Sequence, residues 1–387
     1  MIEREITGEL LKQLSEFPIV TVLGPRQAGK TTLVKAVLPD YRYINLEDPQ
    51  VRSVAEEDPQ AFLRQSGLRV IFDEIQRTPH LLSYLQGLVD NHDEPGLFVL
   101  TGSHQPQLKE AISQTLAGRT GILQLLPLTI GELKRAGIQF KDFEPYLLSG
   151  FMPRVHVQPQ RPQTAYAAYY QTYVERDVRQ LINLKDTGLF EKFMKLLAGR
   201  VGQLLDYSSL GNDVGVDGKT IHHWLSVLEA SFIVFRLHPY FENFGKRVIK
   251  SPKVYFTDTG LLTYLLGIES EQQITRDPLV GNLFENLVVL EILKTRLNQG
   301  KLPQLYFTRD SNGNEIDLLY AAGRSLTGIE IKSGSTYHSS FKKQLLRFHD
   351  EVKPLENRYV IYNGETLSFS DGIRILNFKE ASKVLDV

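Results

Sequence analysis

The sequence predicts a protein of the α/β class that is divided into several domains. Short apolar runs alternate with helix-compatible segments over the first 135 residues, helical periodicity dominates the middle, and three β-rich runs follow a long helix near the end. A chain of 387 residues is also longer than one ordinary core requires, because domains usually contain about 100 to 200 residues. We expect domains at residues 1–135, 136–205, 206–260 and 261–387.

Composition indicates a folded, soluble protein and excludes several kinds of site. Hydrophobic residues make up 42% of the chain and charged residues 23%, as is typical of globular proteins. No apolar run approaches the roughly 20 residues that cross a bilayer, and the amino terminus shows no secretory signal, so we expect a cytoplasmic protein without membrane contact. The chain has no cysteine, which excludes thiolate zinc sites and cysteine nucleophiles. A net charge of −1 argues against coating of nucleic acid by bulk charge but leaves a local basic face open.

The first domain carries four strand-like runs, each followed by sequence that can form a helix. These runs are 18–23, 41–46, 70–73 and 97–101. Such alternation predicts a parallel sheet with helices on both faces. Residues that can take part in ligand binding or catalysis come directly after three of the four runs.

A glycine-rich segment follows the first run and matches the phosphate-binding P-loop pattern. Its glycines let backbone N–H groups converge on phosphate oxygens at the amino end of the next helix. Lys30 would neutralise the β- and γ-phosphate oxygens, and the Thr31 hydroxyl would bind Mg²⁺. A glycine turn before a purely structural helix is the alternative. The nucleotide-binding candidates are Gly24, Pro25, Arg26, Gln27, Ala28, Gly29, Lys30, Thr31 and Thr32.

The run at 70–73 ends in the carboxylate of Asp73, and a second carboxylate, Glu74, follows directly. Asp73 is expected to complete the magnesium site with Thr31, and Glu74 can polarise the water that attacks the γ-phosphate. A solvated acidic turn would explain this pair on its own, but the upstream P-loop argues against that reading. After the next run, Thr101 and Ser103 would place hydroxyl groups beside the γ-phosphate, although an ordinary strand-end turn explains them equally well.

This order of motifs resembles the AAA+ class of ATPases. More narrowly, it resembles a prokaryotic ATPase family in which the segments Gly-Pro-Arg-Gln-Ala-Gly-Lys-Thr, Phe-Asp-Glu-Ile-Gln and Leu-Thr-Gly-Ser recur. The resemblance covers about residues 1–135, and the rest of the chain looks like the companion domain of unknown function. It implies ATP and Mg²⁺ as cofactors and Ser103 or Thr101 as the sensor. It also implies Arg119 as an arginine-finger or sensor candidate. A subunit-bridging role would require a homo-oligomer, and a surface arginine is the alternative.

The middle of the chain reads as helical, with helices expected at 129–136 and 164–185. Two short helical patterns within 206–229 are separated by a glycine-containing turn, and an apolar run follows at 231–237. This order is typical of a winged helix-turn-helix. The region 136–260 is therefore predicted to be a helical segment followed by a winged helix.

The second helix of this unit has a polar outer face opposite its inward residues Ile221 and Leu225. Such a face can lie in the major groove of DNA while basic residues nearby contact phosphates. Winged helices also serve as protein-docking modules, and both readings stay open. The DNA-contact candidates are Lys219, His222, His223, Lys246, Arg247, Lys250 and Lys253.

The last domain is predicted from a helix at 277–297 and β-rich runs at 304–307, 315–320 and 325–331. If the last two runs form a hairpin, their charged residues face one side, because residues two apart in a strand share a face. Two carboxylates with a lysine can hold Mg²⁺ and orient a water for attack on a phosphodiester.

The spacing of Asp317, Glu330 and Lys332 resembles the core of the restriction-endonuclease-like nucleases. Glu285, in the preceding helix, matches an acidic residue that this family often adds. The resemblance implies a restriction-endonuclease-like α/β domain with a candidate nuclease site. A member of that family that has lost catalysis, or an exposed charged hairpin, is the alternative.

The function predicted from these features is a Mg²⁺-dependent ATPase of the AAA+ class that acts on or near DNA through its winged-helix and nuclease-like domains. One alternative is a nucleotide-dependent switch that binds a protein partner. Another is an ATP-regulated nuclease. Glu74 favours turnover over passive binding, because a protein that only binds nucleotide has no need of this carboxylate.

Overall fold

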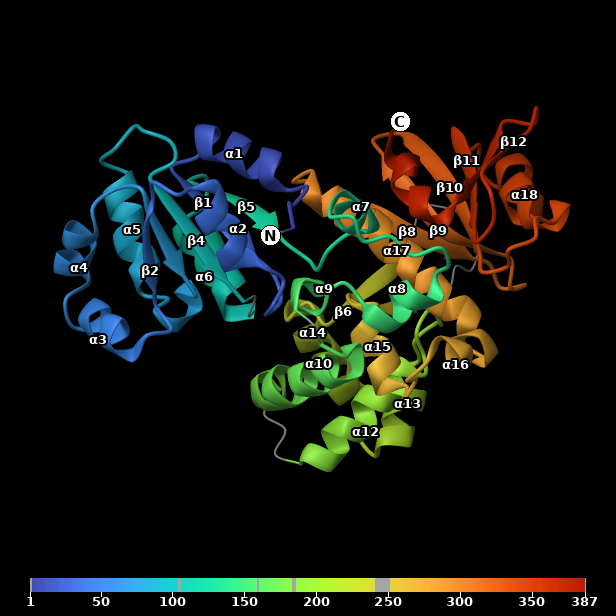
Figure 1. Cartoon of the computed structure of the whole chain (residues 1–387), viewed down its shortest axis with the longest axis horizontal. Helices are drawn as coiled ribbons and strands as arrows, with labels where there is room; N and C mark the ends of the chain where they lie inside the picture. Colours follow the sequence, from blue (N-terminus) through green and yellow to red (C-terminus); the bar gives the residue numbers. More distant parts are fainter. Residues whose placement is uncertain (1, 104–105, 159, 183–185, 241–250, 387) are drawn as a thin grey trace.

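A computed structural model describes residues 2–386 except 104–105, 159, 183–185 and 241–250. In Figure 1 an amino-terminal part built on one sheet lies at the left, a carboxyl-terminal part built on another lies at the upper right, and a helical middle part lies below them. In the part of the chain described here, no helix is both long and apolar enough to span a bilayer.

The amino-terminal sheet has five strands in the order β2-β3-β4-β1-β5, and every pair of neighbours is parallel. β1, β3 and β4 are buried along their whole length, as expected for strands covered on both faces. This confirms the predicted parallel sheet. The strands are β1 Ile19–Leu23, β2 Arg42–Asn45, β3 Val70–Asp73, β4 Phe98–Gly102 and β5 Thr120–Gln124.

Helices cover both faces of this sheet. α1 and α2 share one apolar core with one face, and α3, α4, α5 and α6 share another core with the opposite face. β1 lies between β4 and β5 in this sheet, and the loop that joins it to α2 lies at the carboxyl edge of the sheet. The helices are α1 Thr7–Glu16, α2 Lys30–Val37, α3 Pro49–Glu57, α4 Pro59–Ser66, α5 Leu81–Val89 and α6 Pro106–Thr115, with a short 3₁₀ turn η1 Ile75–Arg77.

The middle part is helical, as predicted, except for one antiparallel strand pair. A long helical run begins at α10, continues as the π-helix η2 and ends in α11. α13, α14 and the pair β6–β7 follow in the order of the predicted winged unit. Lys246, Arg247 and Lys250 lie outside the described residues. The elements are α7 Ile130–Arg135, α8 Glu144–Ser149, α9 Pro153–Val157, α10 Pro162–Tyr169, η2 Tyr170–Val178, α11 Arg179–Leu181, α12 Thr187–Ala198, α13 Tyr207–Val214, α14 Gly218–Ala230, β6 Val234–Pro239 and β7 Lys253–Phe256.

The carboxyl-terminal sheet has eight strands in the order β12-β13-β11-β10-β9-β8-β6-β7. β9 and β10 form the predicted antiparallel hairpin, with Gly323 at a φ of 62° in its turn. β6 pairs with β8, so this sheet continues across the boundary expected at residue 260. The elements are α15 Thr259–Leu265, α16 Glu271–Arg276, α17 Val280–Asn298, β8 Leu305–Arg309, β9 Glu315–Ala322, β10 Ser325–Lys332, η3 Ser339–Lys342, α18 Lys343–Glu351, β11 Asn357–Tyr362, β12 Leu367–Ser368, β13 Ile373–Asn377 and η4 Phe378–Leu385.

Candidate functional site

The loop between β1 and α2 has the backbone geometry of a phosphate cradle. A Cβ atom at Gly24 would lie 2.1 Å from the carbonyl oxygen of Leu125, so only glycine fits there. Gly29 has a φ of 92° just before α2, a conformation that glycine adopts without strain. The loop therefore passes close to β5 and then turns sharply into the helix, as the glycine spacing predicts.

Lys30 is buried at the start of α2 and reaches back over this loop. Its Nζ donates to the carbonyl oxygens of Gly24 and Pro25, each at 2.9 Å. Burial lowers the pKa of Lys30, against the opposing effect of Glu74 and Asp73 nearby. A partly desolvated ammonium group held across the loop is well suited to neutralise a bound phosphate group.

Asp73, at the end of β3, accepts hydrogen bonds from three hydroxyl groups. Thr31 Oγ1 donates to Asp73 Oδ2 at 2.9 Å, the Tyr43 hydroxyl donates to the same oxygen at 2.7 Å, and Thr101 Oγ1 donates to Oδ1. Burial and the hydrogen bond to Asp73 raise the pKa of Tyr43, so its phenol group stays a donor. The structure thus brings Thr31 and Asp73 together, as predicted.

The oxygen pair of Thr31 and Asp73 fits a magnesium ion. Mg²⁺ prefers hard oxygen ligands, keeps several waters and usually takes one or two carboxylates together with phosphate oxygens. Within the described residues, no group of three or more His, Asp or Glu side chains is arranged to hold a metal ion. One carboxylate with a neighbouring hydroxyl oxygen is a ligand set of the kind that Mg²⁺ takes in proteins.

Glu74 follows Asp73 with a φ of 60°, which is uncommon for a residue other than glycine. Ser103 Oγ donates to its Oε2 at 3.0 Å, and Gln76 donates to the same oxygen. Burial alone would raise the pKa of Glu74, but Lys30 and these two hydrogen bonds together hold the pKa below its ordinary value. Glu74 is therefore an oriented, ionised carboxylate.

A cavity of about 1000 Å³ opens in front of the loop. That volume is within the range of small-molecule and cofactor sites. One wall is formed by the loop and α2, and the other wall by residues of the middle part. These are Pro153, Arg154, Val157, Gln158, Thr172, Tyr173 and Arg176. No motif in the sequence singles them out, because they lie more than 120 residues from the loop and reach it only through the tertiary fold.

Arg119 lies away from this cavity. It immediately precedes β5, and its carbonyl oxygen accepts a hydrogen bond from the Ile19 N–H at the amino end of β1. The phosphate loop follows the opposite end of β1. The Arg119 guanidinium instead pairs with Asp90, at 2.5 and 2.9 Å. The structure therefore does not bring Arg119 to the loop of its own chain, and a role in a neighbouring copy stays a prediction.

A second group of charged residues lies where β9 and β10 diverge. Lys332 Nζ lies 3.0 Å from Asp317 Oδ2 and 2.7 Å from Glu330 Oε2. Asp317 Oδ2 also accepts the Ile331 N–H at 2.7 Å, so this carboxylate sits between the two strands. Burial and the neighbouring Asp317 raise the pKa of Glu330 well above its ordinary value. The three predicted residues thus meet.

Glu285 joins this group through Lys253. Lys253 Nζ lies 2.8 Å from Glu285 and 2.5 Å from Glu315, and the Tyr255 hydroxyl donates to Glu285 at 2.5 Å. Burial raises the pKa of Glu285 to about 7. We call Glu285, Glu315, Asp317, Glu330, Lys253 and Lys332 the carboxylate cluster.

The expectation that Lys253 contacts DNA phosphates is wrong. Its side chain is only 3% exposed, because β7 is buried along its whole length and the ammonium group points at carboxylates. By contrast, Lys219, His222 and His223 are exposed on α14, and Ile221 and Leu225 are buried, as predicted.

Comparisons with known proteins divide the chain in three. Residues 16–134 match the family described as an AAA domain, and residues 140–272 and 280–381 match two domains of unknown function, DUF8612 and DUF4143. The uncharacterized protein Rv2008c of Mycobacterium tuberculosis is 33% identical over 337 residues, which are 86% of this chain and 74% of that protein. An uncharacterized protein of Haemophilus influenzae is 23% identical over 392 residues, covering 92% of each chain. The Walker-type ATPase PABY2304 of Pyrococcus abyssi is similar in structure with a TM-score of 0.42 and 16% identity, covering 68% of this chain and 96% of its own.

Proposed function

We propose that this chain, which belongs to the family of the uncharacterized protein Rv2008c of M. tuberculosis and carries an AAA-type P-loop ATPase domain, hydrolyses ATP with the help of Mg²⁺. One observation carries the proposal. Lys30, Thr31, Asp73 and Glu74 meet at the carboxyl ends of β1 and β3, in front of a cavity of about 1000 Å³. A phosphate-binding lysine, a magnesium ligand pair and an oriented carboxylate are the parts that phosphoryl transfer to water needs.

In the proposed reaction the loop amides and Lys30 bind the β- and γ-phosphates, and Thr31 and Asp73 hold Mg²⁺. The bound ion supplies neutralisation of the charge that develops on the phosphate oxygens. Glu74 accepts the proton of the water whose oxygen bonds to the γ-phosphorus while the bond to the departing ADP oxygen breaks. Ser103 and Gln76 keep the carboxylate of Glu74 in place through their hydrogen bonds.

Two substitutions test this assignment. Glu74→Gln should keep nucleotide affinity but lower the rate of ATP hydrolysis by roughly 10²- to 10⁴-fold, the usual contribution of a general base. Lys30→Ala should weaken binding of ATP and ADP by about tenfold or more, because a hydrogen bond to a charged group is lost. Titration calorimetry and steady-state phosphate release measure the two effects. Glu57→Gln and Lys12→Ala, both exposed on helices of the same domain, are matched controls. Hydrolysis by Glu74→Gln at the parent rate would refute the role of Glu74.

A second candidate function is action on DNA. The carboxylate cluster supports it, because Asp317, Glu330 and Lys332 lie within hydrogen-bonding distance of one another beside Glu285 and Lys253. The exposed residues Lys219, His222 and His223 on α14 also support it. At present the two lysines neutralise the carboxylates, so a metal ion would have to displace at least one ammonium group. A switch that binds a protein partner remains the competing reading.

DNA-stimulated ATP hydrolysis and DNA cleavage separate these readings. Single-stranded, duplex and branched DNA are added to the purified chain with Mg²⁺ or Mn²⁺, and phosphate release and strand breaks are followed. Asp317→Ala should abolish cleavage and leave the basal ATPase unchanged, whereas Asp350→Ala on the exposed end of α18 should change neither. Absence of both stimulation and cleavage with every DNA would leave the protein-partner switch as the better reading.

A further inference from the structure

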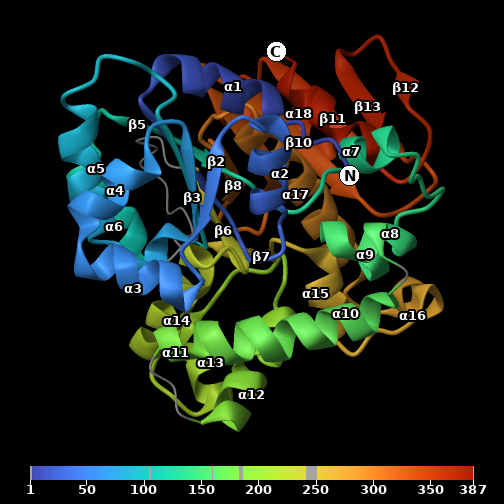
Figure 2. The same ribbon diagram turned by 60° about the vertical axis from the view of Figure 1, so that its left-hand side comes forward.

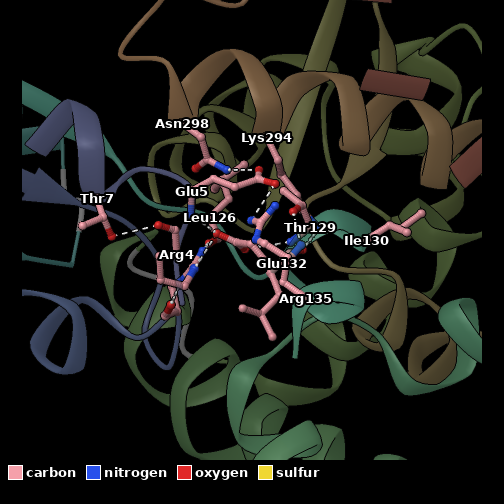
Figure 3. A network of polar contacts seen from close by, with 12 residues as sticks. Arg4, Glu5, Thr7, Leu126, Thr129, Ile130, Glu132, Arg135, Lys294 and Asn298 are labelled. Carbon is pink, nitrogen blue, oxygen red and sulfur yellow. Dashed lines mark hydrogen bonds and ion pairs between the residues drawn. The ribbon is translucent and has the colours of Figure 1, made fainter. Parts of the chain in front are cut away.

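Arg4 reaches the phosphate loop from the segment before α1, although no sequence motif singles it out. Its side chain is 6% exposed and uses three nitrogen atoms as donors. Nη1 donates to the carbonyl oxygen of Ala28 at 2.6 Å, Nη2 to that of Leu126 at 2.7 Å, and Nε to Glu132 Oε1 at 2.9 Å (Figure 3). Arg4 therefore joins the loop to the segment that follows β5.

The bond to Ala28 acts on the peptide group that also contains the N–H of Gly29. A trans peptide is planar, so its carbonyl oxygen and its N–H point in opposite directions. Gly29 has a φ of 92° and lacks a side chain, so its own conformational preference leaves this peptide free to adopt several orientations. The guanidinium of Arg4 removes that freedom, because it holds the carbonyl on one side.

We propose that Arg4 is a positioning residue for phosphate binding, which keeps the Gly29 amide turned away from Arg4 and toward the phosphate. The inference rests on the proposed ATPase function, since it assigns the Gly29 amide to a phosphate oxygen. Arg4 also lines the cavity in front of the loop, and the role proposed for it is exerted on the loop backbone rather than on the reacting atoms. It acts through the loop, in addition to the residues that the motifs predict.

Glu132 holds Arg4 in turn. It is completely buried on α7, where its Oε1 accepts both Arg4 Nε and the Glu5 N–H, and its Oε2 accepts the Thr129 N–H at 2.9 Å. Thr129 and Glu132 form a capping box at the start of α7. The carboxylate of Glu132 is thus fixed by backbone donors, and Arg4 has a rigid anionic partner.

The same segment is anchored on α17 of the carboxyl-terminal part. The Ile130 N–H donates to both carboxylate oxygens of Glu291 at 3.0 Å, and Lys294 Nζ donates to the Leu128 carbonyl at 2.9 Å. Asn298 Nδ2 donates to Glu5 at 3.1 Å (Figure 3). α17 also carries Glu285. This single helix therefore contributes a residue to the carboxylate cluster and contacts the segment that holds Arg4.

The test compares Arg4→Gln and Arg4→Lys with the parent chain of 387 residues. Arg4→Gln should raise the KM for ATP and the Kd for ADP by about tenfold, since a charge-assisted hydrogen bond to the loop is lost, while kcat changes less than the KM. Arg4→Lys keeps the charge but not the planar set of donors, so it should recover only part of the affinity. Arg135→Gln is the matched control, because Arg135 pairs with Glu5 at 2.9 Å from the exposed side of α7 without contacting the loop.

The KM values of two further variants distinguish a positioning role of Arg4 from a purely structural one. Glu132→Gln keeps an oxygen for the cap but loses the charge that holds Arg4, so it should also raise the KM for ATP. The double variant Arg4→Gln with Glu132→Gln should have a KM only slightly higher than Arg4→Gln alone. Kinetics are measured well below the thermal midpoint of every variant. If the parent hydrolyses ATP while Arg4→Lys and Glu132→Gln keep the parent KM, this inference fails alone. If the parent binds no nucleotide, the proposed function itself fails.

Discussion

At the scale of single residues, Asp73 is where three separate segments converge. Thr31 comes from α2, Tyr43 from β2 and Thr101 from β4, and all three donate to the same carboxylate. Hydrogen bonds to an ionised group are stronger than those between neutral groups, and these fix the orientation of the carboxylate before any cation binds. The proposed magnesium ligand is thus preorganised by side chains from α2, β2 and β4.

Tyr43→Phe tests this preorganisation. Loss of the phenol donor should raise the Mg²⁺ concentration for half-maximal ATP hydrolysis by about tenfold, because a hydrogen bond to a charged group contributes roughly 1.5 to 3 kcal/mol. The rate at saturating Mg²⁺ should change little, since Tyr43 does not contact the γ-phosphate in the proposed mechanism. Magnesium titrations of phosphate release provide the measurement.

Tyr41→Phe is the control for this titration. Tyr41 lies two residues earlier and donates to the Gly96 carbonyl at 2.6 Å, away from Asp73. An equal shift in both variants would mean that Tyr43 acts through general stability rather than through Asp73.

The sequence predicts the site residues that belong to a motif of consecutive residues. Lys30, Thr31 and Asp73 belong to local patterns, and the structure brings them together. Tyr43 and Arg4 reach the site only through the tertiary fold, so no spacing predicts them. Lys253 shows the opposite error, because its basic stretch predicts an exposed side chain, whereas β7 pairs with β6 in the sheet and Lys253 is buried against Glu285 and Glu315.

At the scale of elements, α17 is buried over most of its length and carries ionisable groups into the core. Glu291 and Lys294 lie within this helix, and both are shielded from solvent. Burial raises the pKa of Glu291 to about 7 and lowers the pKa of Lys294 to about 8. The two opposite charges interact electrostatically within the core, so removing one leaves the other less compensated.

The effect of Glu291→Gln should therefore depend on pH. The pKa of Glu291 rises from 4.5 to about 7 on folding, so between these values the folded chain keeps a proton that the unfolded chain has released. The stability of the parent relative to Glu291→Gln should fall as the pH rises through this window, by up to roughly 3 kcal/mol. In Glu291→Gln, loss of the carboxylate charge also lowers the pKa of Lys294 further, so the variant gains stability as the pH rises. The stability of the parent relative to the variant therefore falls with rising pH for this reason too.

Thermal unfolding midpoints of parent and variant between pH 5 and about 7.5 measure this difference. Glu269→Gln, an exposed carboxylate before α16, should show no such trend. A difference between parent and Glu291→Gln that stays constant with pH would mean that Glu291 remains ionised in the fold.

Element prediction succeeded where the periodic pattern was strong. The strands β1 to β4, the hairpin β9–β10 and the helix α17 lie within a few residues of their expected ranges. The sequence does not predict β5, since it contains Gly121 and leaves Ile122 exposed at the edge of its sheet. The boundary expected at residue 260 stays a prediction, and the pairing of β6 with β8 across it is a long-range contact that local sequence does not encode.

At the scale of the whole molecule, the cavity beside the phosphate loop belongs to two parts of the chain. The middle part lies beside the amino-terminal part in both views (Figures 1 and 2). Pro153, from α9, approaches Gly29 closely enough that a Cβ on the glycine would lie 3.7 Å from it. Arg26 Cζ lies 5.6 Å from the centre of the ring of Tyr173, which belongs to the π-helix η2, and this is a cation–π distance. A nucleotide in this cavity would contact the middle part as well as the loop.

Binding of ADP to the chain of 387 residues should therefore slow backbone hydrogen exchange in three segments at once: the phosphate loop, α9 and η2. With ADP at about 100 times its Kd, amides that exchange only when the cavity opens should slow by up to about 100-fold, because the ligand stabilises the closed state by mass action. Hydrogen exchange with mass spectrometry resolves these segments, and α18, which lies outside the cavity lining, is the internal control. Lys30→Ala should remove the protection in α9 and η2 together with that of the loop, since all three depend on one ligand. Protection confined to residues 24–32 would show that the middle part forms no wall of the nucleotide site, and residues such as Arg154 would then have no part in binding.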